Sequence, residues 1–199
     1  MRFFHSPGSC SVGIRVLLEM AQAPYDLVTV SIAKGDHRKP EYLAINPKGK
    51  VPALQLDDGQ LITEFPVIAQ WIARHFPKAG LLPDGELNEY RALELVEFIV
   101  SSLHMRGSVF LLRPEKFTHD ASAQDDLRQH GREVLTEGFE ALDQRLGESE
   151  YFFDRFTIVD AAMFYLMNWK DRIGVPLPAR LEAYHQRLLA LPAVQRALA

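Results

Sequence analysis

Hydrophobic residues in the first part of the chain follow strand and helix patterns in turn. Arg2–His5 is a short apolar run typical of a strand, and hydrophobic residues recur at helical spacing from about Ser11 to Met20. Residues 25–30 are rich in β-forming side chains. Asp57-Asp58-Gly59 between two apolar runs predicts a hairpin, and a helix follows from about Pro66 to Arg74. This order, β-α-β and then ββ-α, predicts one mixed sheet.

The pattern changes after a stretch rich in proline and glycine, Pro77 to Pro83, which is typical of a linker. Every later pattern is helical, with stripes over 87–103, 127–146, 157–170 and 179–191. We therefore predict an α+β chain of two domains. The first is an α/β domain over residues 1–77, joined by a linker over 78–86 to an all-α bundle over 87–199.

Composition narrows the classes of protein to which the chain can belong. Hydrophobic residues make up 47% and charged residues 24%, a balance typical of a globular protein. A net charge of −4 argues against nucleic-acid binding, and a single cysteine excludes an internal disulfide or a cysteine zinc site. The longest apolar stretch, Ala161 to Met167, is too short to span a membrane, and we see no signal peptide. We expect a soluble cytoplasmic protein.

Cys10, the only cysteine, lies in Ser6-Pro7-Gly8-Ser9-Cys10-Ser11 between the first strand and the first helix. A thiol at a helix N-terminus faces unpaired N–H groups and the positive end of the helix dipole, and both favour the thiolate. Free cysteine is also among the most buried residue types. Position alone therefore supports an activated thiol and a small buried side chain equally well.

Two further segments carry signals about the local backbone. Thr157-Ile158-Val159-Asp160 matches a capping box with a shorter acidic arm than usual, and we predict that its function is structural. Val51-Pro52 precedes a strand, where proline marks an edge or a special turn. A cis bond there would aim the Val51 backbone outward toward an extended ligand, but the sequence leaves cis and trans open.

Several titratable residues have both a binding and a structural interpretation. Glu64 precedes Phe65-Pro66 at a predicted helix start, where it can bind an ammonium group or serve as an exposed cap. His104 lies near the predicted end of a helix, and interaction with that helix C-terminus is the simpler explanation for it alone. Glu182 and His185 share a spacing found in some metal sites. Because no second such pair exists, we predict a solvated helix face there and no metal.

Together these segments resemble the cytosolic glutathione transferases, and within them the bacterial Beta-like branch. The similarity covers essentially the whole chain, and its matching segments are residues 6–11, 44–54, 62–64 and 156–161. It implies a thioredoxin-like βαβ-ββα domain followed by an all-α helical bundle domain. It also implies a homodimer that serves in detoxification.

The resemblance assigns the binding of glutathione to residues of the first domain. Cys10 would lie beside the glutathione sulfur and form a mixed disulfide with it. Val51, before a cis Pro52, would pair its backbone with the cysteinyl part of the tripeptide. Glu64 and the backbone of Phe65 would hold the γ-glutamyl end, which carries both an ammonium and a carboxylate.

The resemblance also implies roles for residues around this core. His104 would reach the thiol from the helical domain, and Lys34 or Lys50 would lie near the glycyl carboxylate. Ser9 or Ser11 is an alternative to Cys10, because a serine hydroxyl assists the thiolate in other branches of the family. The acceptor would bind in an apolar cleft between the domains.

We therefore predict an enzyme that uses glutathione as co-substrate and transfers its thiolate to a hydrophobic electrophile or a disulfide. Cys10 favours disulfide chemistry, because exchange proceeds through a mixed disulfide. This chain departs from the family pattern at His5, where Tyr is common, at Phe65, where Ser is frequent, and at Met105, where a Lys can occur. These departures keep a non-catalytic binding protein as an alternative. A glutathione-dependent isomerase or dehalogenase is a third hypothesis.

Overall fold

The structure is a computed structural model that describes all residues from Met1 to Ala199, and its contacts divide the chain into two units. One unit comprises Met1–Leu82 together with Ala190–Ala199, and the other comprises Pro83–Leu189. The predicted division assigned residues 87–199 to the helical domain, so the structure differs from it at the C-terminal end. We call the two parts the N-terminal unit and the helical unit.

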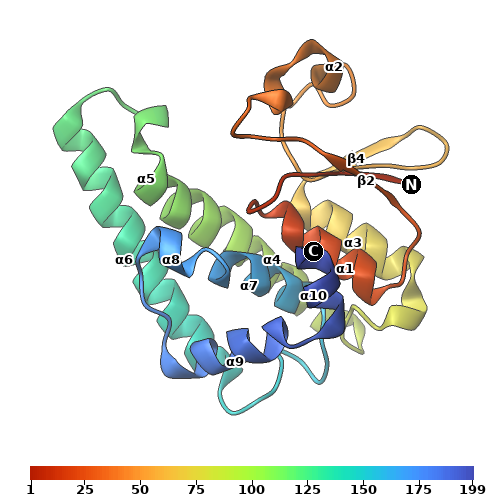
Figure 1. Cartoon of the computed structure of the whole chain (residues 1–199). Coiled ribbons are helices and arrows are strands. Elements are labelled where there is room, and N and C mark those ends of the chain that lie inside the picture. Colours follow the sequence, from red (N-terminus) through yellow and green to blue (C-terminus); the bar gives the residue numbers. More distant parts are fainter. The chain divides into compact units, whose positions relative to one another are not determined.

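The N-terminal unit is built on a four-stranded sheet in the order β2-β1-β3-β4. Its elements before the linker are β1 (Arg2–His5), α1 (Ser11–Met20), β2 (Asp26–Thr29), η1 (Asp36–Arg38), α2 (Pro40–Leu43), β3 (Ala53–Gln55), β4 (Leu61–Thr63), α3 (Phe65–His75) and η2 (Pro77–Ala79). Strand β1 runs parallel to β2 and antiparallel to β3, which pairs with β4 as a hairpin. The predicted mixed sheet is confirmed. Helices α1 and α3 lie on one side of the sheet and α2 on the other (Figure 1).

The last helix of the chain completes the N-terminal unit. Helix α10 (Pro192–Leu198) packs against α1, as Figure 1 shows. It buries Ala193, Val194 and Ala197. The Arg196 Nε atom also donates to Glu19 Oε2 of α1 at 2.8 Å. Burial of this small apolar face against α1 explains why the C-terminal residues leave the helical unit.

The helical unit contains only helices, as the sequence patterns predict. Its elements are α4 (Glu86–Glu97), the π-helical segment η3 (Phe98–Ser108), α5 (Val109–Leu112), η4 (Pro114–Lys116), α6 (Ala121–Leu146), α7 (Ile158–Met167), α8 (Lys170–Ile173) and α9 (Ala179–Leu189). Helix α7 is buried along its whole length and contacts α4, η3 and α9. It is therefore the central helix of this unit.

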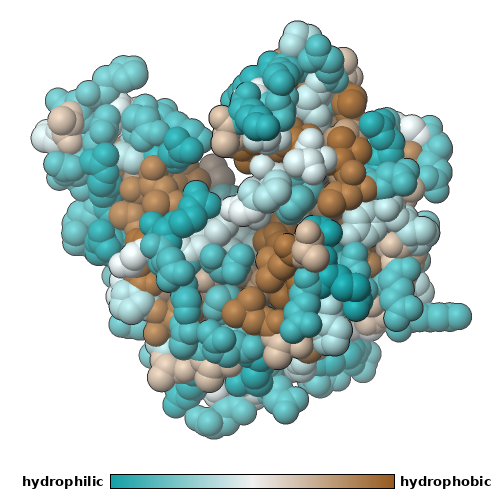
Figure 2. Space-filling view, viewed as in Figure 1, coloured by the Kyte–Doolittle hydropathy of each residue, from teal (hydrophilic) through white to brown (hydrophobic).

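Helices α4, η3 and α5 form one continuous helix, Glu86–Leu112, that is long and apolar enough to cross a membrane by length and composition alone. The longest uninterrupted apolar stretch of the sequence, Ala161 to Met167, lies outside this helix and so did not indicate it. Its residues Val96, Ile99 and Leu103 are fully buried, and η3 packs closely against α6. A Cβ atom added to Gly131 of α6 would lie 2.6 Å from the backbone oxygen of Gly107 in η3. These contacts bury one face of the helix against the rest of the unit, and 33% of its most apolar stretch is buried. Hydrophilic residues cover most of this unit's visible face (Figure 2).

The predicted capping box at the start of α7 is confirmed. The Thr157 N–H donates to Asp160 Oδ2 at 2.7 Å, and the Val159 N–H donates to Thr157 Oγ1 at 3.3 Å. The Tyr184 hydroxyl of α9 donates to the other carboxylate oxygen of Asp160. The predicted solvated face around His185 is wrong, because this side chain is buried and packs against the Phe164 ring.

Candidate functional site

Cys10 is the N-cap residue of α1, as the sequence predicts. Its Sγ atom donates to the Val51 carbonyl oxygen at 3.8 Å. Although Cys10 keeps some solvent exposure, burial raises the pKa of its thiol to about 12, and the opposing effect of the backbone N–H groups of Cys10 and Ser11 is smaller. Of the two interpretations drawn from position, this shift favours the small buried side chain in the free protein, and the activated thiol stays a prediction.

The segment before β3 is held in place by two side chains of the preceding region. The Tyr42 hydroxyl donates to the Lys50 carbonyl oxygen at 2.6 Å, and Asn46 Nδ2 donates to the same oxygen at 2.8 Å. The Val51–Pro52 bond that follows is cis, which is the conformation that the sequence left open. Tyr42 and Asn46 thus fix the backbone on which Val51 lies, a supporting role that no sequence signal indicated.

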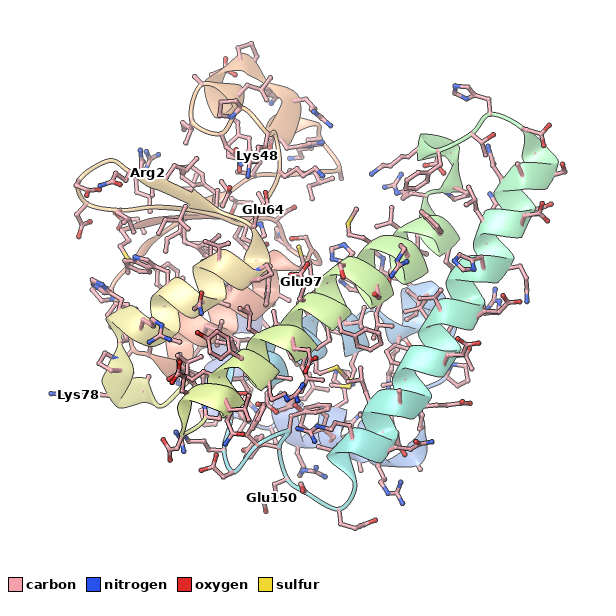
Figure 3. All side chains as sticks on the ribbon, turned by 180° about the vertical axis from the view of Figure 1, so that it is seen from behind. Arg2, Lys48, Glu64, Lys78, Glu97 and Glu150 are labelled. Atoms are coloured by element: carbon pink, nitrogen blue, oxygen red, sulfur yellow. The ribbon has the colours of Figure 1, made fainter.

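Glu64 lies at the point where β4 ends and α3 begins. It has φ of 70° and ψ of 131°, no side chain caps α3, and the Glu64 side chain is 58% exposed. Lys48 Nζ donates to Glu64 Oε1 at 2.7 Å and to Thr63 Oγ1 at 2.8 Å, and Figure 3 shows Lys48 and Glu64 near each other. The Phe65 side chain is buried, so the residue can offer a ligand only its backbone N–H. The N-terminal end of α3 can therefore offer an acidic side chain and a positive helix dipole to one ligand.

Lys48 is the residue that sequence reasoning missed at this end of the site. The segment Asn46-Pro47-Lys48-Gly49-Lys50 contains two lysines, and only Lys50 was singled out. A pairing sixteen residues apart between Lys48 and Glu64 leaves no local pattern. The two lysines in one loop were the only available signal.

Serine hydroxyls and His5 form a connected group beside Cys10. His5 Nδ1 lies 2.8 Å from Ser11 Oγ, which lies 2.7 Å from Ser9 Oγ. Ser11 is fully buried, whereas Ser9 keeps some exposure. Of the two serines named from the sequence, only Ser9 is therefore accessible to a ligand.

Charges at both ends of this region act on the Cys10 thiol. The carboxylate of Glu64 raises the pKa of Cys10 and the ammonium group of Lys50 lowers it, both less strongly than burial does. The structure thus brings Cys10, Val51, Lys50 and Glu64 together in the N-terminal unit. Lys34 is an exposed residue of the turn after β2, and its predicted contact with a carboxylate stays a prediction.

His104 belongs to the helical unit and lies within η3, not near a helix end. The expected interaction with a helix C-terminus is wrong, because the helix continues to Leu112. The His104 ring packs edge-on against Trp169 with centroids 4.8 Å apart, and its Nδ1 lies 3.4 Å from the Tyr165 hydroxyl. Its predicted role toward a ligand thiol stays a prediction.

Comparison with known proteins places this arrangement in a family. Residues 8–75 match the family model "Glutathione S-transferase, N-terminal domain". Over 100% of this chain and 97% of the relative, the sequence is 32% identical to glutathione S-transferase GstA of Escherichia coli O157:H7. The chain belongs to the glutathione S-transferase family. The thioredoxin-like sheet followed by a helical domain, which the resemblance implied, is thereby confirmed.

Solved structures and further relatives of this glutathione S-transferase family member agree with the assignment. A Beta-class glutathione S-transferase from Sphingomonas chungbukensis superposes with a TM-score of 0.85 at 34% identity, covering 100% of this chain and 97% of the other. A glutathione transferase homolog from Sulfitobacter, solved with bound glutathione, gives a TM-score of 0.90 at 28% identity over 98% and 95% of the two chains. A maleylacetoacetate isomerase of Pseudomonas aeruginosa is 30% identical over 94% of this chain and 90% of the relative.

Proposed function

We propose that this family member binds glutathione as its co-substrate on the N-terminal unit and transfers the glutathione thiolate to a hydrophobic electrophile or a disulfide. In the proposed complex the tripeptide is extended. Its sulfur lies at the start of α1, its cysteinyl backbone pairs with Val51 beside Pro52, and its γ-glutamyl end lies at Glu64 and the Phe65 backbone. Lys50 or Lys34 receives the glycyl carboxylate.

The observation that carries this proposal is the convergence of Cys10, Val51 and Glu64. The Cys10 thiol lies 3.8 Å from the Val51 carbonyl, and the charge of Glu64 acts on the same thiol. A thiol subsite, a stretch of backbone at the part-buried Val51 and an acidic helix start are the three groups that glutathione needs, since it carries a thiol, peptide groups and a zwitterionic end. In the free protein Lys48 Nζ donates to Glu64 Oε1. When the ammonium group of the ligand binds, Lys48 must therefore break this hydrogen bond or share the carboxylate with the ligand.

We propose that the acceptor is apolar and that His104 assists the thiol from the helical unit. An aromatic pair in the helical unit, Phe110 and Phe117, supports an apolar acceptor because Phe117 is 51% exposed. We propose a cytoplasmic homodimer that serves in detoxification. Large exposed hydrophobic side chains such as Val67 and Tyr90 favour cover by a second copy, and a single unpaired cysteine suits a reducing compartment.

Calorimetric titration with glutathione tests the binding site. We expect wild type to bind, and Glu64→Ala to bind at least about tenfold more weakly because a charged hydrogen bond to the ligand ammonium is lost. Glu41→Gln is the matched control, since it removes one exposed negative charge from α2 of the same unit. Absence of glutathione binding by wild type would overturn the proposal in favour of a non-catalytic protein.

Activity assays then separate the possible reactions. Conjugation of an aryl halide and reduction of a mixed disulfide are measured in parallel with wild type and Cys10→Ala. We expect Cys10→Ala to lose disulfide reduction more than conjugation, because the former passes through a mixed disulfide. The isomerase relatives favour one further candidate function, the isomerisation of maleylacetoacetate. An isomerase would convert that substrate without consuming glutathione, whereas a transferase consumes one molecule per turnover.

A further inference from the structure

Lys48 lies in the loop between α2 and β3, and a buried side chain fixes the backbone of that loop. Asn46 is 1% exposed, its Oδ1 accepts from the Lys48 N–H at 3.2 Å, and its Nδ2 donates to the Lys50 carbonyl oxygen at 2.8 Å. Between the two lysines, Gly49 has φ of 59°, and its N–H donates to the Asn46 carbonyl oxygen at 2.9 Å. The position of the Lys48 backbone therefore depends on buried hydrogen bonds and not on an exposed ion pair alone.

The Lys48 ammonium group contacts the last residue of β4 and the residue that precedes α3. Lys48 Nζ donates to Thr63 Oγ1 at 2.8 Å and to Glu64 Oε1 at 2.7 Å. An ammonium group has three N–H donors, and a carboxylate can accept at both of its oxygens. Since these are the only hydrogen bonds of either side chain and both are more than half exposed, the ion pair keeps one donor and one acceptor for a ligand.

This donor and this acceptor match the two charges at the γ-glutamyl end of glutathione. There an ammonium group and a carboxylate are bonded to the same carbon atom. A ligand ammonium bound at Glu64 therefore brings its own carboxylate close to the Glu64 carboxylate, and two like charges repel each other unless a positive charge lies beside them. Lys48 Nζ lies 2.7 Å from Glu64 Oε1, whereas the buried side chain of Phe65 has no group that can donate. Lys48 thus lies where it can offset this repulsion.

We propose that Lys48 is a specificity-determining residue, which binds the α-carboxylate of the γ-glutamyl group while Glu64 binds the α-ammonium group. The inference deepens the proposed function and rests on it. In the complex, Lys48 keeps its hydrogen bonds to Thr63 and Glu64 and donates its third N–H to the ligand carboxylate. Glu64 accepts from the ligand ammonium at Oε2.

The ion pair of the free protein then selects a ligand end that carries both charges. A zwitterion places an ammonium beside Glu64 and a carboxylate beside Lys48, so both protein charges gain a partner and their own hydrogen bond is kept. A ligand that carries the ammonium alone has no group for Lys48 and is repelled by its charge. Lys48 therefore assists a zwitterion and opposes a simple amine.

Calorimetric titration of the full-length protein with two peptides tests this role. One is glutathione, and the other is 4-aminobutanoyl-cysteinylglycine, which keeps the ammonium group and lacks the α-carboxylate. We expect Lys48→Met to bind glutathione about tenfold more weakly, because a hydrogen bond between two charged groups is lost. The same variant should bind the second peptide at least as tightly as wild type does, because Glu64 no longer shares its carboxylate with a lysine.

Three further variants separate the charge of Lys48 from its position. Lys48→Arg keeps the charge and should bind glutathione within about threefold of wild type. Thr63→Val removes the hydroxyl that holds Nζ, and it should weaken glutathione binding by a smaller factor than Lys48→Met does. Lys78→Met is the matched control, because it removes an exposed positive charge from η2, beyond the C-terminal end of α3 and away from Glu64 (Figure 3). It should leave both affinities unchanged.

The two peptides also separate the inference from the proposed function. Equal weakening of both peptides in Lys48→Met would assign Lys48 to the structure of the loop. Tighter binding of glutathione by this variant would assign Lys48 to competition with the ligand ammonium, and an unchanged affinity would mean that other groups hold the α-carboxylate. Each of these results would overturn the inference and leave glutathione binding intact, whereas no glutathione binding by wild type would overturn the proposed function and the inference with it.

Discussion

Burial determines the ionisation of the key side chains in both units. It raises the pKa of Cys10 to about 12, lowers that of His5 to about 4 and raises that of Asp160 to about 6. Each shift favours the neutral form, as expected when water is removed from an ionisable group. The pKa of Asp160 shifts least of the three, because the Tyr184 hydroxyl and the Thr157 N–H and hydroxyl donate to its carboxylate and oppose the effect of burial.

Asp160 should make the stability of the folded protein depend on pH. The pKa is about 6 in the folded protein against an ordinary value of 3.8, so the folded state binds this proton more tightly. The stabilisation is complete below the ordinary pKa and is lost as pH rises through the folded pKa. The free energy of unfolding of wild type should therefore rise relative to Asp160→Asn as pH falls, with a slope approaching about 1.4 kcal/mol per pH unit between the two values.

Urea unfolding at a series of pH values measures this difference. Asp126→Asn is the control, because it removes one exposed carboxylate from α6 of the same unit. Parallel stability curves for wild type and Asp160→Asn would contradict the assignment.

Two helices of the helical unit begin with side-chain caps in opposite surroundings. Thr157 caps α7 and is fully buried, whereas Asp120 caps α6 at an exposed position, where it accepts from the Ala123 N–H at 2.9 Å. Water can replace a lost cap at an exposed helix start, but it cannot reach the N–H groups of a buried one. The same capping interaction should therefore contribute differently in the two helices.

Removal of the buried cap should destabilise the protein more than removal of the exposed one. We expect Thr157→Ala to lower the free energy of unfolding by about 2 kcal/mol, and Asp120→Ala by about 0.5–1 kcal/mol. Thr157→Ser keeps the hydroxyl and should lose less than Thr157→Ala. Chemical denaturation of the three variants provides the comparison. Equal losses for the two alanine variants would show that burial of the helix start does not matter.

The last helix of the chain, α10, belongs to the N-terminal unit, in which the chain also begins. Helix α10 follows the helical unit in sequence but buries its apolar face against α1, the helix that starts at Cys10. Both ends of the chain thus support the element on which the proposed thiol subsite lies. Substitutions that weaken the packing of α10 should therefore lower the stability of the N-terminal unit.

Substitutions in α10 separate packing from ion pairing. Val194 is fully buried, and Val194→Ala should cost about 1–3 kcal/mol of unfolding free energy. The Arg196–Glu19 pair is partly exposed, and Arg196→Ala should cost less than about 1 kcal/mol. Thermal and urea unfolding measure both. A larger loss from Arg196→Ala would mean that the ion pair, rather than burial, holds α10 in place.

Signals that act over a few residues were sufficient to predict most elements of the fold. The strand Arg2–His5, the helix that begins at Ser11 and the capping box at Thr157 all lie where periodicity and local hydrogen-bonding patterns indicated. Each of these elements depends on residues that lie within one or two turns along the chain, so the local sequence is sufficient to predict it. The resemblance of several such segments then identified the family, which the relatives confirmed.

Interactions between distant residues carried no comparable signal. The burial that raises the pKa of Cys10 and the pairing of Lys48 with Glu64 both depend on which segments meet. An amphipathic stripe shows that α10 must bury a face but does not identify its partner, so the contact units differ there from the predicted division. Electrostatics and hydrogen bonding depend on distance and on the exclusion of water, and both are fixed only when the chain has folded.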